Sequence, residues 1–142
     1  MDAPIAELIV LEKFKTAKIY LEETSNTLIV EVTRSYIPIN EFKEIFNKAY
    51  EFIPQYSINK LVFDKRKLMV FHQPSMEWYF VEWKEKAFDM GLNCVRKVLP
   101  KDKIFQQSVK IGRAKIEGEH PNAKFHQIDI AYVYSLEQAL DS

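Results

Sequence analysis

The sequence predicts an α/β protein built on a single, mostly parallel sheet. Residues 18–23 and 27–33 are apolar, strand-like segments, and the turn-forming residues Thr24, Ser25 and Asn26 separate them. This pattern predicts an N-terminal β-hairpin. Beyond the hairpin, short apolar segments alternate with long segments of helical periodicity. Such alternation is typical of parallel strands joined by right-handed helical crossovers.

The remaining elements follow in the order β-β-α-β-α-β-α-β-α. Apolar residues at helical spacing predict a first helix between Asn40 and Pro54, a second from Ser75 to Met90, and a third over about residues 103–117. The apolar stripe of the second helix contains Met76, Tyr79, Phe80, Trp83, Ala87 and Met90. Strands are expected at 60–64, 94–99 and 125–134, and a capping box at Ser135 and Gln138 opens a short last helix.

The length of 142 residues is typical of one domain. We expect residues 18–142 to form it, with residues 1–17 as an N-terminal extension or an extra strand.

Composition excludes several classes of function. Lys and Arg together number 20, as do Asp and Glu, so no net charge attracts nucleic acid. The three glycines are scattered, whereas phosphate-binding loops need them clustered. No apolar segment is long enough to insert into a membrane. The single cysteine, Cys94, precludes a disulfide within the chain, and together these features favour a cytoplasmic location.

The C-terminal segment YSLEQAL, residues 134–140, and the order of the elements carry a resemblance. The final strand running into Ser-Leu-Glu-x-Ala-Leu resembles bacterial STAS-like (SpoIIAA-like) domains, which occur in anti-sigma-factor antagonists and sulfate transporters. The resemblance implies a regulatory or binding module with this α/β fold. In the antagonists, a serine after the third strand is phosphorylated, and Ser75 lies near that position. The family's Asp-Ser-Ser-Gly is replaced here by Gln-Pro-Ser-Met, so a kinase partner is not transferred.

Ser75 has two interpretations. It is a helix N-cap that satisfies a free backbone amide, or it is a phosphosite favoured by the helix dipole.

The segment before Ser75 is the principal candidate contact surface. Lys65, Arg66 and Lys67 either form a solvated loop or contact an anion or acidic partner near the end of a parallel strand. Residues 68–71, which include Met69 and Phe71, follow as a strand extension or a hydrophobic flap, and His72 comes next as a further candidate contact. Trp78 lies off the predicted core stripe, so it covers a neighbouring element or a partner.

No catalytic or metal site is expected. His126 and Asp129 would point to opposite faces of one strand, and no nucleophile, base and orienting group share a supporting spacing.

We therefore expect a non-enzymatic STAS-like module without a cofactor, acting on a protein partner or by self-association. The alternative is a carrier for a small apolar or anionic ligand of the lipid or nucleotide class. Enzymatic activity ranks last.

Overall fold

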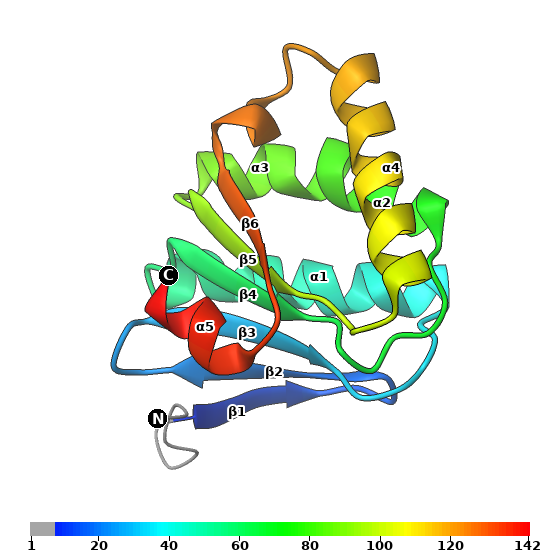
Figure 1. Cartoon of the computed structure of the whole chain (residues 1–142). Helices are drawn as coiled ribbons and strands as arrows, with labels where there is room; N and C mark the ends of the chain where they lie inside the picture. The colour runs from blue at the N-terminus through cyan, green and yellow to red at the C-terminus, as the bar shows by residue number, and fades with distance from the viewer. Residues whose placement is uncertain (1–7) are drawn as a thin grey trace.

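A computed structural model describes residues 8–142 and contains one six-stranded sheet (Figure 1). The strands lie side by side in the order in which they occur along the chain. The first two neighbouring pairs are antiparallel and the remaining three are parallel. The strands are β1 (Leu8–Lys13), β2 (Ala17–Glu22), β3 (Thr27–Val32), β4 (Lys60–Asp64), β5 (Cys94–Val98) and β6 (Asp129–Val133).

The helices connect the parallel strands and cover one face of the sheet. Each crossover advances by one strand in the same direction, and right-handed crossovers of this kind place their helices on a common side. Figure 1 shows α1, α3 and α4 on that side and the short α5 on the other. The helical segments are α1 (Ile39–Gln55), α2 (Gln73–Trp78), η2 (Tyr79–Trp83), α3 (Lys84–Asp89), α4 (Lys103–Glu119), η3 (Lys124–Gln127) and α5 (Leu136–Asp141).

Two hydrophobic cores result from this arrangement. The larger core lies between the sheet and the crossover helices and includes the buried rings of Phe46, Tyr79 and Trp83. The smaller one lies beneath α5, where Ala139 packs with Ile29 and other strand residues. Because both faces are covered, the central strands β3 and β4 are largely apolar on both sides, whereas β5 carries the buried Arg96 and Lys97.

The structure confirms the predicted α/β class, the N-terminal hairpin and the mostly parallel later strands. Within the predicted extension, β1 is an extra strand that pairs with β2, while residues 1–7 lie outside the described part.

Two predicted elements differ in detail. The helix predicted from Ser75 to Met90 contains a π-helical turn, η2, between α2 and α3. The last strand is shorter than predicted, because residues 124–127 form a 3₁₀ turn before it.

Candidate functional site

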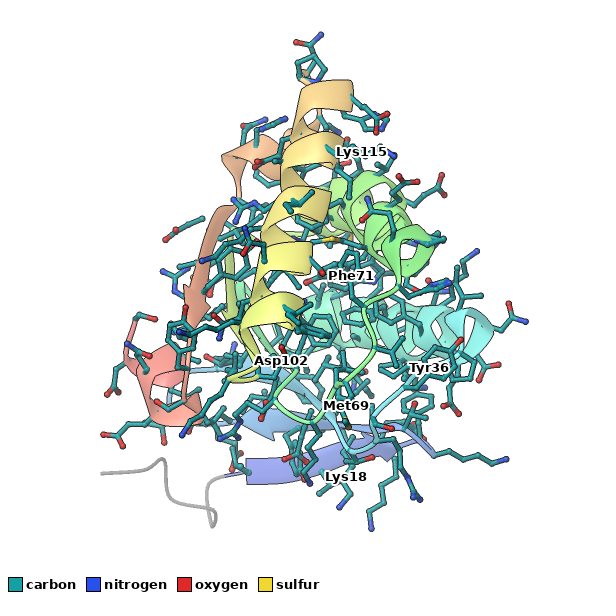
Figure 2. The ribbon with its side chains drawn as sticks, turned by 45° about the vertical axis from the view of Figure 1, so that its right-hand side comes forward. Lys18, Tyr36, Met69, Phe71, Asp102 and Lys115 are labelled. Atoms are coloured by element: carbon teal, nitrogen blue, oxygen red, sulfur yellow. The ribbon has the colours of Figure 1, made fainter. Side chains whose placement is uncertain are left out.

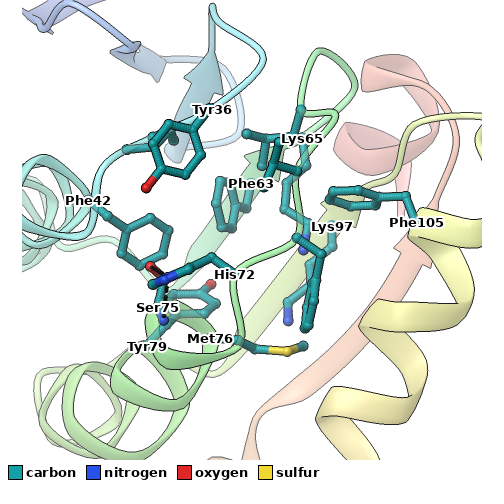
Figure 3. Close-up of a pocket in the computed structure, with 14 residues that line it drawn as sticks. Tyr36, Phe42, Phe63, Lys65, His72, Ser75, Met76, Tyr79, Lys97 and Phe105 are labelled. Atoms are coloured by element: carbon teal, nitrogen blue, oxygen red, sulfur yellow. Dashed lines mark hydrogen bonds between the residues drawn. The ribbon is translucent and has the colours of Figure 1, made fainter.

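An aromatic pocket opens near the carboxyl ends of β4 and β5, on the face covered by the crossover helices (Figure 3). Its cavity volume is about 50 Å³, so an occupant must be small or the pocket walls must move. Open α/β sheets bind ligands beyond the carboxyl ends of their strands, which is where this pocket lies. Its aromatic walls are Tyr36, Phe42, Phe63, Phe71, Tyr79 and Phe105.

The alternation of side chains along β4 and β5 directs two lysines into this pocket. Lys65 follows Phe63 by two residues, so both side chains lie on the same face of the sheet. Lys97 lies between Val95 and Leu99 on that face, and the parallel register pairs it with Phe63. Figure 3 shows Lys65 and Lys97 extending into the region between Phe63 and Phe105.

Lys65 is a buried cation surrounded by aromatic rings. The residue is only 7% exposed. Its Nζ lies 5.3 Å from the ring centre of Phe63 and 5.8 Å from that of Phe105. Burial lowers the pKa of Lys65 to about 8, so the amine is still mostly protonated at pH 7. Among residues 8–142 it forms no ion pair, which leaves it available to an anion.

The amine of Lys84 lies beside that of Lys97, over the same ring. Lys84 and Lys97 are both fully buried, and their Nζ atoms lie 3.6 and 4.3 Å from the ring centre of Phe80. Within the described chain, neither amine has a carboxylate or carbonyl acceptor. Burial, followed by the charge of Lys84, holds the pKa of Lys97 well below its usual range. Burial, followed by the charge of Arg113, does the same to the pKa of Lys84.

The surroundings of the two amines are aromatic or cationic. Tyr79 lies 4.5 Å from the Lys84 Nζ, measured to the ring centre, and burial raises the pKa of its own hydroxyl. Arg113 lies over the ring of Tyr132 at 5.5 Å, and its Nε binds Glu117 at 3.2 Å. Because Glu117 is already paired with Arg113, it compensates the lysines weakly.

The structure separates the three cations that the sequence grouped as one loop. Lys65 enters the pocket, so a fully solvated loop is wrong for this residue. Arg66 pairs with Asp64 through Nε at 3.0 Å and Nη2 at 2.7 Å. Lys67 is exposed.

The apolar residues after these cations lie in different environments. Figure 2 shows the segment of Met69 and Phe71 between Tyr36 and Asp102, the residue before α4. Phe71 lines the pocket, whereas Met69 is 76% exposed, and its backbone amide donates to the Ser35 carbonyl at 2.9 Å. The segment forms neither a strand nor an extension of β4.

Trp78 is half-buried and contacts α1. Its ring meets that of Phe42 edge-on at 6.1 Å, and the Nζ of Lys43 lies 5.8 Å from its centre. It therefore covers a neighbouring element of its own chain, one of the two predicted roles.

The prediction that Ser75 caps the second helix is wrong. The cap is His72, whose Nδ1 accepts a hydrogen bond from the Ser75 backbone amide at 3.3 Å. Proline at the start of α2 fixes the first helical turn earlier than predicted, which moves Ser75 inside it. The Ser75 hydroxyl lies 2.8 Å from the same His72 atom, and the residue is 5% exposed. The phosphosite interpretation of Ser75 stays a prediction.

Lys84 and Lys97 were missed by the sequence interpretation, although the periodicity carried a signal for each. Lys84 follows Phe80 by four residues, within the apolar stripe of the second helix. Lys97 occupies an inward position on a central strand. A lysine at either kind of position is rarely buried without a partner.

Comparison with family models, curated proteins and solved structures yields no match to this chain. No helix within residues 8–142 has the length and apolar character needed to cross a bilayer. The described residues also contain no group of three or more His, Cys, Asp or Glu side chains arranged to hold a metal ion.

Proposed function

We propose that the protein binds a small amphipathic acid in the aromatic pocket, with the apolar body among the rings and the acidic group at Lys65. The observation that carries this proposal is a 7% exposed, predominantly charged lysine that ends in an apolar pocket without an anionic partner in the described chain. A buried charge is costly unless it is paired, and a bound anion would supply the missing pair. This is the carrier function that the sequence left as an alternative.

Calorimetry with two acids and their neutral amides tests the proposal. Benzoate and octanoate are expected to bind, and benzamide and octanamide to bind at least about tenfold more weakly, because a hydrogen bond to a charged group contributes about 1.5–3 kcal/mol. Lys65→Met should remove the preference for the acids. Lys67→Met, on the exposed neighbour, is the matched control and should behave as wild type. Equal binding of acid and amide by the wild type would exclude this role for Lys65.

The second candidate is a protein-interaction module of the STAS-like type. One observation favours it: Met69 is 76% exposed and Val70 is 47% exposed, on the segment that borders the pocket. Sedimentation of the wild type and of Met69→Asp over a range of concentrations tests self-association. A wild-type protein that stays monomeric throughout would remove that form of the hypothesis.

A further inference from the structure

The buried pair Lys84 and Lys97 is not needed for binding an acid at Lys65. Both amines are 0% exposed, and the nearest groups around them are the rings of Tyr79, Phe80 and Tyr132 and the cation Arg113. Two like charges in such an environment disfavour each other, and an apolar surrounding disfavours both. The arrangement therefore favours the neutral, nucleophilic form of the amine.

A π-helical turn, which departs from regular α-helical geometry, helps to hold the pair in place. The π-helical turn Tyr79–Trp83 ends at Lys84, and single π-helical turns are frequent at functional sites. Lys97 is fixed from the other side by parallel pairing with Phe63 on β4 and Tyr132 on β6. Two rigid elements therefore hold the amines together.

The two lysines differ in their relation to the pocket. Lys97 forms part of the pocket wall, together with Tyr79, whereas Lys84 does not (Figure 3). Lys97 is therefore the amine of the pair that lies nearer to a ligand in the pocket, and because its Nζ has no exposed surface the pocket wall must move before the two can touch. The Tyr79 hydroxyl, which has no hydrogen-bond partner within the described chain, lies on a residue of the same wall.

We propose that Lys97 is a carbonyl-reactive amine, which condenses with an aldehyde or ketone group of a ligand in the pocket, and that Lys84 is its positioning residue. The Lys97 nitrogen forms a bond to the carbonyl carbon, the carbonyl oxygen leaves as water with the two amine protons, and a C=N bond results. No oxidant or reductant is consumed. The reaction uses the pocket of the proposed function, but it does not require the acid to bind at Lys65.

Reductive trapping with benzaldehyde and cyanoborohydride tests this chemistry. At pH 7, an amine with an ordinary lysine pKa is neutral in fewer than about 1 molecule in 1,000, so exposed lysines react slowly. One benzyl group on Lys97, located by peptide fragmentation and added at least tenfold faster than on the exposed Lys101, is the expected result. Its rate should rise less steeply from pH 7 to 9 than the labelling of Lys101, which rises about tenfold per pH unit.

The pH profile depends on every charged or titratable group that faces the pair: Lys65, Tyr79, Arg113, Glu117 and Tyr132. Among these, Lys65 titrates within the range tested, with a pKa of about 8. Lys65→Met is therefore measured in parallel, and labelling of Lys97 should persist in it.

Variants separate a reactive role from a structural one. Lys97→Arg keeps a positive charge but has no neutral form, so labelling at this position should disappear. Lys97→Met serves the same purpose without a buried charge, in case the arginine variant does not fold. Lys84→Met should slow labelling of Lys97, because it removes the neighbouring cation that favours the neutral amine.

Calorimetry with benzoate on the same wild-type sample distinguishes the two hypotheses. Benzoate binding without labelling of Lys97 would overturn the reactive amine and leave the proposed function standing. Labelling of Lys97 without benzoate binding would support the reactive amine and overturn the proposed acid-binding function. Label spread over the exposed lysines, with Lys97 unmodified, also overturns the inference.

Discussion

Replacing Lys65 by methionine should stabilise the protein while it removes acid binding. The two side chains have similar length, so the substitution keeps most of the contacts with Phe63 and Phe105. What it deletes is the buried ammonium group. Residues at ligand sites commonly lower stability in this way, because they are arranged for the ligand rather than for the empty fold.

The magnitude follows from the pKa of Lys65. Burial lowers it from 10.5 to about 8, a difference of about 2.5 units. At 1.36 kcal/mol per unit, the buried charge costs at most about 3 kcal/mol. Because the folded pKa is the lower one, the folded protein binds fewer protons between pH 8 and 10.5. The full cost is therefore present below about pH 8 and disappears as the pH rises towards 10.5.

Urea unfolding followed by tryptophan fluorescence measures this effect. At pH 7, Lys65→Met should raise the free energy of unfolding by up to about 3 kcal/mol relative to wild type, and at pH 10 the gain should be much smaller. The difference between the two proteins isolates Lys65, because Lys84 and Lys97 are present in both. Lys67→Met is the control and should change stability by less than about 0.5 kcal/mol. A loss of 1 kcal/mol or more in Lys65→Met at pH 7 would refute the interpretation of Lys65 as an uncompensated charge.

Three further substitutions test the packing around the site. Lys84→Met should raise the free energy of unfolding by about 1–3 kcal/mol, because it removes a buried donor that has no acceptor. The control Lys86→Met, on the exposed side of α3, should not raise it. Equal effects of the two substitutions in urea unfolding would contradict this expectation. Gly112→Ala should lower stability and weaken benzoate binding in calorimetry, because the new Cβ would lie 2.8 Å from the Phe71 ring of the pocket wall. The control Gly118→Ala has open space around the new Cβ, so it should be neutral or stabilising by up to about 1 kcal/mol. A Gly112→Ala protein that binds benzoate normally would show that the wall adapts. His72→Ala should cost about 1 kcal/mol in urea unfolding through loss of the α2 cap, and an unchanged stability would show that the cap is dispensable.

Local pattern was sufficient for the class of fold. The turn residues after residue 23 indicated the hairpin, and the β2–β3 register confirms it. The stripe containing Tyr79, Phe80 and Trp83 correctly predicted the inward face of the second helix, although Met90 at its end is 40% exposed. These features depend on residues close together in the chain, so periodicity reveals them.

The composition of the site was determined by contacts between distant segments. The sequence placed Lys65 and Phe71 near a candidate contact surface, but their loop gave no indication that Lys65 turns inward while Arg66 pairs with Asp64. A lysine beside two other cations is ordinarily solvated, and nothing local distinguishes the exception.

By itself, the sequence determined the alternation of strands and helices, the hairpin and the apolar faces, because each is set by side chains within a few residues of one another. The tertiary structure alone decided that Lys65, Lys84 and Lys97 converge. Their meeting requires the parallel register that places Lys97 beside Phe63, and the packing of a π-helical turn over that face of the sheet. Both depend on segments that are far apart in the chain, so the burial of these amines is a property of the assembled fold.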